Sequence, residues 1–373
     1  MISRIIGHKI KERLHQEKII LLFGARQVGK TTLLKKIVSE YGNYLWYNAD
    51  DPEVQVLFDN PSSVRLRNYF SQHKLVVIDE AQQLPEIGKT LKRIIDSIDN
   101  VQVVATGSSS FELRNRTNEP LTGRKWEFYL YPLSFSELAR HTSLMEEVQQ
   151  IPHRLVYGSY PEVVIHPKEA KERLKLIAES YLYKDILMWQ NIQKPDKLVN
   201  LLKALAYQVG SEVNYNELSK LLSIDNVTVE KYITLLEQTF VIFRLPSYSH
   251  NHRKELKKGR KIYFYDVGVR NALLGDFSLL ELRHDVGALW ENWVIAELYK
   301  KNSYEGGFGN FYFWRTFDQQ EIDLIIEKDG VLNAYEIKWN KNAKINISKT
   351  FSSTYPNHEV HFIHPGNVDE FLL

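Results

Sequence analysis

The stretch that decides the fold of the first part of this chain is GARQVGKT, residues 24–31. It matches the pattern G-x-x-x-x-G-K-[ST] and lies between an apolar run at 19–23 and an expected helix over 32–38. In such a loop, glycines let backbone N–H groups curl around phosphates, and the helix adds the partial positive charge of its N-terminus. The pattern and its context predict a P-loop that binds ATP.

The expected nucleotide site extends outward from this loop. Lys30 is expected to reach the outer phosphates as a catalytic residue, and Thr31 to offer its hydroxyl to Mg²⁺. The apolar run 101–105 leads into a hydroxyl-rich segment at the same sheet edge, where a hydroxyl could sense the γ-phosphate. The predicted nucleotide-binding residues are Gly24, Ala25, Arg26, Gln27, Val28, Gly29, Lys30, Thr31, Thr32 and Ser108.

A second motif, LVVIDE at 75–80, ends an apolar run with two carboxylates. Paired negative charge there is unfavourable unless a cation or a water molecule uses it. We expect Asp79 to hold Mg²⁺ through water and Glu80 to polarise the attacking water as a catalytic residue. The structural alternatives are a glycine turn with an incidental lysine and a solvated strand end, and both would have to occur in one chain by accident.

Arg124, in the segment LTGR at 121–124, is a candidate arginine finger. ATP hydrolysis benefits from a cation placed on the developing phosphate charge, and a neighbouring subunit often supplies it. An ordinary surface arginine is the equally weighted alternative.

The distribution of apolar runs predicts an α/β protein of several domains. Runs at 19–23, 44–47, 75–78 and 101–105, separated by amphipathic stretches, are typical of buried strands in a parallel sheet. We expect a P-loop ATPase domain at 1–140, a helical lid with a winged helix-turn-helix at 141–270, and a small α/β domain at 271–373. The winged helix is expected from helices at 216–222 and 227–238 and a strand at 240–245.

A basic segment, HNHRKELKKGRK at 250–261, follows that strand and is expected to form the tip of a hairpin. Cations at such a tip would reach successive phosphates of DNA, duplex or branched, and give salt-sensitive binding. The expected DNA-contacting residues are Arg253, Lys254, Lys257, Lys258, Arg260 and Lys261. A winged helix that binds protein, with a merely solvated basic loop, is the alternative. Residues 227–232 carry few side chains suited to base reading, so sequence specificity is not expected.

The C-terminal part carries a spaced group of charges. Asp323 lies near the start of one expected strand, and Glu336 and Lys338 lie two apart on its hairpin partner, so they share a face. Two carboxylates that bind Mg²⁺ and a lysine beside the attacking water are the groups that metal-dependent phosphodiester cleavage needs. A solvated hairpin face is the structural alternative. His358, His361 and His364 do not share one face of a strand, so they are interpreted as structural or surface residues.

The composition of the chain limits the kinds of chemistry and the location that can be expected. The chain has 373 residues, a formal net charge of +2, and no cysteine, which excludes disulfides, thiolate nucleophiles and cysteine-zinc sites. No segment approaches the length of a membrane span, and the N-terminus lacks the apolar stretch of a signal peptide. We therefore expect a cytoplasmic protein without a membrane partner.

Together these motifs resemble the AAA-type ATPases, common in archaea and bacteria, whose C-terminal part is a domain of unknown function similar to PD-(D/E)XK nucleases. Beyond GARQVGKT and LVVIDEAQ, the resemblance rests on TGSSSFEL, LTGR, YPLSFSEL, YGSYPEV, KIYFYDVGVRNALL, GALWENWVIAEL, FWRT, EIDLIIE and EIKW. It implies a AAA+ module able to form a homo-oligomer such as a hexameric ring, and it strengthens Arg124 as a finger acting in trans. In the nuclease pattern a preceding helix adds another acid. Glu291 is the better candidate metal ligand here, and Glu297 the second.

Two functions of different class follow. The leading hypothesis is an ATP-dependent DNA-processing enzyme, which uses ATP and Mg²⁺ and cleaves DNA at the C-terminal site. The alternative is a nucleotide-gated oligomeric switch or scaffold, whose C-terminal domain binds a partner without catalysis. A transport or chaperone ATPase is disfavoured because no pore loop is evident.

Overall fold

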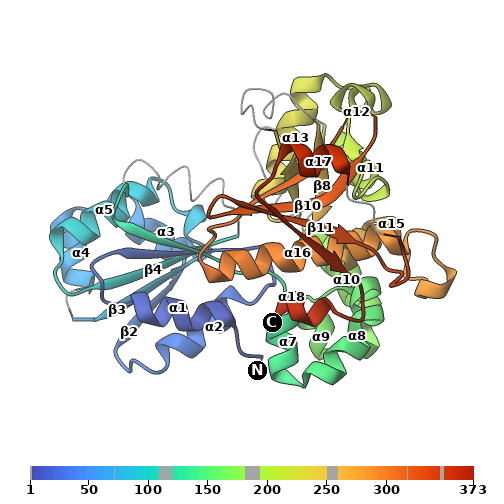
Figure 1. Cartoon of the computed structure of the whole chain (residues 1–373). Helices are drawn as coiled ribbons and strands as arrows, with labels where there is room; N and C mark the ends of the chain where they lie inside the picture. The colour runs from blue at the N-terminus through green and yellow to red at the C-terminus, as the bar shows by residue number, and fades with distance from the viewer. Residues whose placement is uncertain are drawn as a thin grey trace. The chain divides into compact units, whose positions relative to one another are not determined.

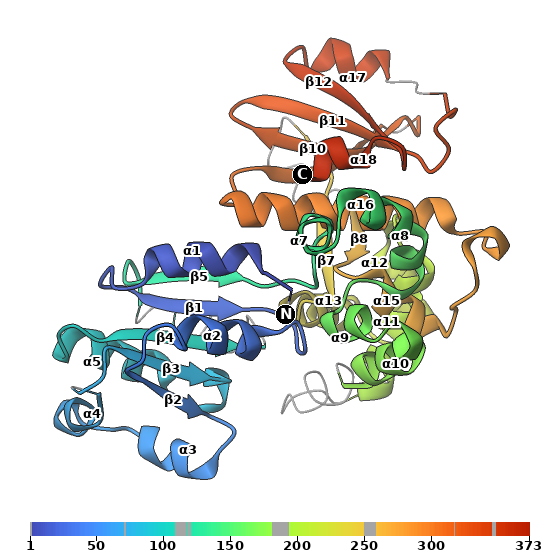
Figure 2. The ribbon, with the colours of Figure 1, turned by 90° about the horizontal axis from the view of Figure 1, so that it is seen from below.

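The computed structural model describes residues 2–70, 72–108, 117, 121–180, 194–249, 259–316, 318–344 and 348–373. The chain divides into two compact units. The first unit consists of Met1–Tyr131 with Gln238–Phe240, and the second of Pro132–Glu237 with Val241–Leu373. The ribbon is shown in two orientations (Figures 1 and 2).

A parallel five-stranded sheet forms the centre of the first unit. The strand order across it is β2 (Tyr44–Asn48), β3 (Leu75–Asp79), β4 (Gln102–Gly107), β1 (Ile19–Phe23) and β5 (Lys125–Tyr129). Every residue of β1, β3 and β4 is buried, as expected for continuous apolar strands covered on both faces. The predicted α/β architecture with a parallel P-loop sheet is confirmed.

The strand β5 was missing from the predicted set. Its residues KWEFY are all half-buried and mix charged with aromatic side chains, so no apolar run marks it. It pairs in parallel with β1 as the edge strand of the sheet, and one residue in register with it is Ile19, opposite Lys125.

The helices of the first unit cover both faces of its sheet, with α1 and α2 on one side and α5 on the other (Figures 1 and 2). These elements are α1 (Ile5–Arg13), α2 (Lys30–Val38), α3 (Pro52–Phe58), α4 (Ser63–Phe70), the 3₁₀ turn η1 (Ala81–Gln83) and α5 (Ile87–Ser97). Local sequence fixes their starts: Asp51 caps α3 by accepting a hydrogen bond from the Glu53 N–H, and Pro52 begins the helix.

The second unit begins with helices and continues into a short three-stranded antiparallel sheet of order β6-β8-β7. The elements are α7 (Phe135–His141), α8 (Leu144–Tyr157), α9 (Pro161–Ile165), η2 (Pro167–Glu169), α10 (Ala170–Ser180), α11 (Pro195–Tyr207), β6 (Glu212–Val213), α12 (Tyr215–Leu222), α13 (Asn226–Gln238), β7 (Ile242–Pro246), β8 (Arg260–Phe264) and α15 (Val267–Leu274). The helix pair α12–α13 and the strand β7 lie within a residue or two of the predicted bounds. Ser223 turns the chain between the helices in the left-handed region at φ 53°.

A four-stranded sheet of order β12-β11-β10-β9 completes the second unit. Its elements are η4 (Leu280–Leu282), α16 (Val286–Glu305), β9 (Asn310–Arg315), β10 (Glu321–Lys328), β11 (Val331–Ile337), α17 (Lys349–Thr354), β12 (His358–Ile363) and α18 (Val368–Leu372). The predicted hairpin is present as β10 and β11, with β9 antiparallel to β10 and β12 parallel to β11. The core beside this sheet includes Trp314, Ile325 and Phe351.

The predicted domain limits at 140 and 270 do not fall between elements. Residue 140 lies within α7 and residue 270 within α15. Within the described ranges, no helix has both the length and the apolar character needed to cross a bilayer.

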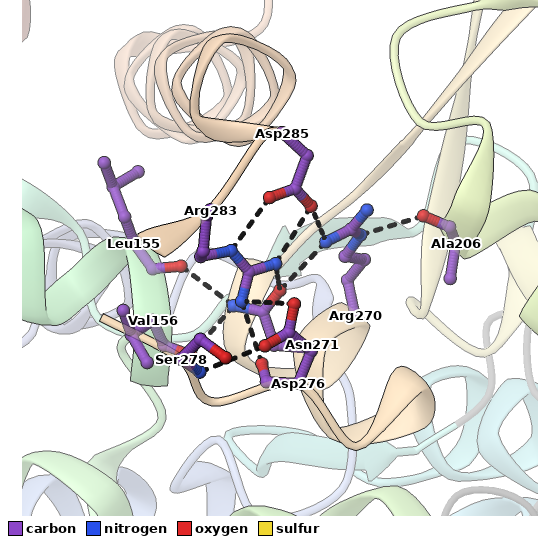
Figure 3. Close-up of polar contacts among 9 residues, drawn as sticks. All are labelled: Leu155, Val156, Ala206, Arg270, Asn271, Asp276, Ser278, Arg283 and Asp285. Carbon is purple, nitrogen blue, oxygen red and sulfur yellow. Dashed lines mark hydrogen bonds and ion pairs between the residues drawn. The ribbon is translucent and has the colours of Figure 1, made fainter. Parts of the chain in front are cut away.

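A buried ion cluster fastens the loop after α15 to neighbouring helices (Figure 3). The Asp285 carboxylate accepts two hydrogen bonds from Arg283, at 2.8 and 2.9 Å, and one from Arg270 at 2.6 Å. Arg270 also donates to the Ala206 carbonyl of α11, and Asn271 donates to the carbonyls of Leu155 and Val156 in α8. Fork-shaped guanidinium groups suit such bidentate pairing, so the Asp285 carboxylate is shared by two buried cations, and Asp276 is a second partner of Arg283.

Candidate functional site

The loop between β1 and α2 has the backbone that its glycines predict. Gly29 adopts φ 95° at the start of α2, a conformation that L side chains rarely adopt. A Cβ on Gly24 would lie 2.2 Å from the Leu130 carbonyl oxygen, so no side chain fits there. Both glycines are therefore needed for the shape of the loop.

Lys30 is 5% exposed and folds back over this loop. Its ammonium donates to the carbonyls of Gly24 at 2.8 Å and Ala25 at 3.0 Å. The ammonium group therefore lies against the backbone of the loop that is expected to surround a phosphate.

Side chains from the start of α2 and from near the end of β4 both contact Asp79, the last residue of β3. The Thr31 hydroxyl donates to one carboxylate oxygen of Asp79 at 2.8 Å, and the Thr106 hydroxyl donates to the other at 2.5 Å. Asp79 is 5% exposed. Carboxylate and hydroxyl oxygens are the ligands that Mg²⁺ prefers, so the donor set of Thr31 and Asp79 fits this ion.

Glu80 leaves β3 in the left-handed region, at φ 54°. Its N–H donates to the Thr106 hydroxyl oxygen at 3.0 Å, which places Thr106 between the two adjacent acids. The Gln82 side chain donates to the Glu80 carboxylate at 2.5 Å and to the Ser108 hydroxyl at 3.1 Å. Ser108, predicted to contact nucleotide, lies in this network through Gln82.

Gln82 had no assigned role in the sequence interpretation, and Thr106 was one of several hydroxyls expected near the γ-phosphate, without a contact to Asp79. The signal for Thr106 was the adjacency of parallel strands: β3 and β4 pair, so Thr106, next to the last residue of β4, meets Asp79 at the end of β3. Gln82 lies two residues beyond Glu80, in the turn η1.

Arg124 lies at the opposite edge of the first unit's sheet from the P-loop. Its carbonyl accepts from the N–H of Ile19, the first residue of β1, whereas the P-loop follows the last residue of that strand. Its guanidinium is half-exposed and pairs with Asp96. Arg124 therefore cannot serve the P-loop of its own chain, and its role in trans stays a prediction.

In the second unit the predicted acids and lysine of the hairpin meet. Asp323 lies where the pairing of β10 with β9 shifts register, an irregularity that re-aims side chains. Its carboxylate accepts from the Ile337 N–H at 2.8 Å and from the Lys338 ammonium at 2.7 Å. The same ammonium lies 3.2 Å from the Glu336 carboxylate.

The close approach of these charges shifts the pKa values of Glu336 and Lys338. Burial and the neighbouring Asp323 carboxylate raise the pKa of Glu336 to about 7. Burial alone would lower the pKa of Lys338, but the carboxylates of Asp323 and Glu336 reverse that effect and raise it. The lysine therefore stays charged, while the Glu336 proton exchanges near neutral pH.

Glu291, on α16, approaches the same group from the helix. It accepts a hydrogen bond from the Tyr263 hydroxyl at 2.6 Å and lies 3.2 Å from the Lys261 ammonium. Burial raises the pKa of Glu291, with Lys261 opposing and the Asp323 charge adding to the rise. Glu297, the second candidate, instead accepts from the Phe135 N–H and from Lys300, so it serves the interior packing of α16.

Within the described part of the chain, no three His, Cys, Asp or Glu side chains lie close enough to hold one metal ion. A metal at this site would therefore have two carboxylate ligands from the protein, Asp323 and Glu336. The roles of Asp323, Glu336 and Glu291 as metal ligands remain predictions. His358 and His361 hydrogen-bond locally, to the Tyr355 carbonyl and the Asn333 side chain, as structural residues do.

The prediction that Lys261 contacts DNA from an exposed hairpin tip is wrong. Its side chain is 2% exposed and pairs with Glu291 and Glu321, because it lies on the face of β8 that meets α16. Arg260 is half-buried beside Glu230 and the Tyr215 hydroxyl. The other four predicted contacts, Arg253, Lys254, Lys257 and Lys258, lie outside the described residues.

Comparison with known proteins places three family models along the chain. Residues 16–139 match an AAA domain, residues 148–279 a domain of unknown function (DUF8612), and residues 286–371 a domain of unknown function (DUF4143). The first match agrees with the observed parallel sheet, so residues 16–139 are similar to an AAA domain in sequence and have a P-loop ATPase fold. The other two matches assign no activity.

Relatives extend over most of the chain. An uncharacterized protein of Haemophilus influenzae is 28% identical over 357 residues, covering 88% of this chain and 85% of its own length. An uncharacterized protein of Mycobacterium tuberculosis is 26% identical over 345 residues, covering 91% of this chain and 74% of its own length. A Walker-type ATPase of Pyrococcus abyssi has a similar fold, with a TM-score of 0.51 and 17% identity, covering 74% of this chain and 96% of that one.

Proposed function

We propose that the N-terminal unit binds ATP with Mg²⁺ and hydrolyses it. The observation that carries this proposal is the hydrogen bond of 2.8 Å between the Thr31 hydroxyl and the Asp79 carboxylate, which joins the start of α2 to the end of β3. Both groups are then in place for a shared Mg²⁺ ion, which supplies charge neutralisation for the phosphates.

The chain's own residues divide the remaining work. Lys30 exchanges its contacts with the Gly24 and Ala25 carbonyls for phosphate oxygens. Glu80 orients the attacking water, and Gln82 holds its carboxylate until a nucleotide is bound. Thr106 keeps the Asp79 carboxylate oriented.

Replacing Lys30 with alanine is expected to weaken ATP binding by about 10- to 100-fold, because a charge-assisted contact to the phosphates is lost. Calorimetric titration of the full chain with ATP and Mg²⁺ measures this effect. Lys36, an exposed residue of the same helix, provides the matched control: Lys36→Ala should bind ATP as the unaltered protein does. Equal affinity of the Lys30 variant and this control would rule out the proposed site.

As a second function we propose metal-dependent phosphodiester cleavage by the C-terminal site. The favouring observation is the Lys338 ammonium, which lies 2.7 Å from Asp323 and 3.2 Å from Glu336 and is partly exposed. Asp323 and Glu336 are oxygen donors that suit Mg²⁺, and the ion would stabilise the charge of the transition state. Lys338 would hold the attacking water.

The substrate proposed for this site is duplex or branched DNA. The support is the basic segment 250–261, with Arg253, Lys254, Lys257 and Lys258 as phosphate contacts. Assembly into a ring, with Arg124 acting on the next subunit, is part of the same proposal. A nucleotide-gated scaffold without cleavage is the competing function.

A cleavage panel separates these functions. Linear, forked and four-way DNA are incubated with Mg²⁺ or Mn²⁺, with and without ATP. Asp323→Ala is expected to slow cleavage by about 10- to 100-fold, as loss of a ligand to the metal does. Glu327→Ala, further along the same strand, is the control. Cleavage that needs no metal would contradict the proposed chemistry, and the absence of cleavage on every DNA while ATP still binds would favour the scaffold.

A further inference from the structure

Lys261 is a buried cation that the proposed reaction does not yet use. Its side chain is 2% exposed, and its ammonium lies 2.5 Å from the Glu321 carboxylate and 3.2 Å from that of Glu291. The Phe313 ring closes another side, with its centroid 5.5 Å away. An ammonium so enclosed is neutralised by two carboxylates and has little contact with water.

The position of Lys261 is fixed by the backbone as well as by charge. Lys261 and Tyr263 are two residues apart on β8 and so share a face, and both contact the same oxygen of Glu291. The neighbouring Asn292 side chain accepts from the N–H of Phe264 and donates to its carbonyl, which fixes α16 against β8. The strand that carries Lys261 and the helix that carries Glu291 are therefore held together by hydrogen bonds that do not depend on the ion pair.

Lys338 and Lys261 differ in how readily a divalent ion could displace their ammonium groups from the carboxylates. The side chain of Lys338 is 39% exposed, so water can solvate its ammonium when another cation approaches Asp323 and Glu336. Lys261 cannot reach water from its position, and removing one partner of a buried ion pair typically costs about 3–5 kcal/mol. A divalent ion can therefore displace Lys338 and cannot displace Lys261.

We propose that Lys261 is a resident cation of the C-terminal site, holding by its ammonium the place beside Glu291 that a divalent ion would otherwise take. The metal is then confined to Asp323 and Glu336, and Glu291 acts as a positioning residue through Lys261. This inference rests on the proposed metal-dependent function. Through Lys261, it also connects β8, the strand at the end of the basic segment 250–261, to the carboxylates of the C-terminal site.

Counting bound Mn²⁺ tests this assignment without relying on activity. Full-length variants are titrated with Mn²⁺ in the absence of nucleotide, and bound ion is counted by electron paramagnetic resonance. Differences between variants cancel any ion held by the N-terminal unit. Asp323→Asn should lose one ion relative to the unaltered chain, and Glu291→Gln should lose none.

Lys261→Met should gain one Mn²⁺ ion, because Glu291 and Glu321 are left without a cation. Lys328→Met, which removes an exposed lysine at the end of β10, should leave the count unchanged. Should Lys261→Met fail to fold, Glu291→Gln still decides, since it keeps the pair of Lys261 with Glu321.

Loss of the Asp323-dependent ion in Glu291→Gln would overturn the assignment, because Glu291 would then be a ligand, while the metal-dependent function would stand. A folded Lys261→Met variant that gains no ion would also overturn it. If the unaltered chain holds no Asp323-dependent ion, the assignment and the proposed cleavage fall together.

Discussion

The Glu80→Gln variant is expected to hydrolyse ATP at least about 100-fold more slowly than the unaltered chain while still binding it. An amide has nearly the shape of the carboxylate but cannot orient a water molecule as a base does. Lys30, Thr31 and Asp79 keep their contacts, so the phosphates and Mg²⁺ remain bound. The loss therefore appears in the rate of turnover rather than in affinity.

Glu86 offers a matched control for this substitution. Like Glu80 it occupies the left-handed region at φ 54° at the start of a helical segment, but it is exposed and pairs with Lys89. Glu86→Gln should hydrolyse ATP at the unaltered rate. Phosphate release and nucleotide affinity are measured on both variants. A Glu80→Gln variant that keeps more than half of the normal rate would remove Glu80 from the proposed chemistry.

The sequence was sufficient for four of the five strands of the first sheet and for the P-loop, because those features are local. Continuous apolar runs mark the buried strands β1, β3 and β4, and the spacing of Gly24, Gly29 and Lys30 defines the loop between a strand and a helix. The edge strand β5 carries no such run, since one side of an edge strand has no neighbouring strand and tolerates charged residues.

The candidate site residues were predictable only where the spacing was regular. Glu336 and Lys338 lie two apart and share a face, and their contact with Asp323 follows from hairpin pairing. Lys261 was assigned to an exposed tip because its neighbours in sequence are basic. Lys261 is buried because it contacts Glu291 of α16, 30 residues later in the chain. A pattern of charges along the sequence does not contain that information.

Both candidate sites hold an internal hydrogen-bond donor against acids proposed to bind a metal. In the first unit the Thr31 and Thr106 hydroxyls donate to Asp79, and in the second the Lys338 ammonium donates to Asp323. Such contacts avoid the cost of a buried carboxylate without a partner. They also set the order of events, because the Thr31 hydroxyl and the Lys338 ammonium must yield as a metal arrives, while Thr106 keeps its contact with Asp79.

Asp285→Asn is expected to lower the free energy of unfolding of the second unit by about 2–4 kcal/mol, because two buried arginines lose the charge of a shared partner that is itself 32% exposed. Asp285 is the shared partner of Arg270 and Arg283, whose side chains are 3% and 1% exposed. An amide provides one acceptor oxygen without charge, so two guanidinium groups would remain buried without sufficient compensation. Figure 3 shows the other acceptors of the two arginines, which are the Ala206 carbonyl, the Asn271 side chain and Asp276.

The same cluster predicts a dependence of stability on pH. Although burial opposes ionisation, hydrogen bonds from Arg283 and Arg270 lower the pKa of Asp285 from 3.8 to about 2. A carboxyl whose pKa is depressed by folding stabilises the fold above its unfolded pKa and loses that contribution as pH falls through the folded value. The cluster should thus contribute about 2 kcal/mol above pH 4, lost progressively between about pH 4 and 2.

Chemical unfolding at neutral pH and at a series of acidic pH values measures both effects. Asp276→Asn is the control, because Asp276 is 40% exposed and pairs only with the outer side of Arg283, so its loss should cost less than about 1 kcal/mol. In Asp285→Asn the part of the acid dependence due to this cluster should disappear. If the two variants unfold at the same denaturant concentration, the buried arginines are stabilised by other groups and the shared-carboxylate account is wrong.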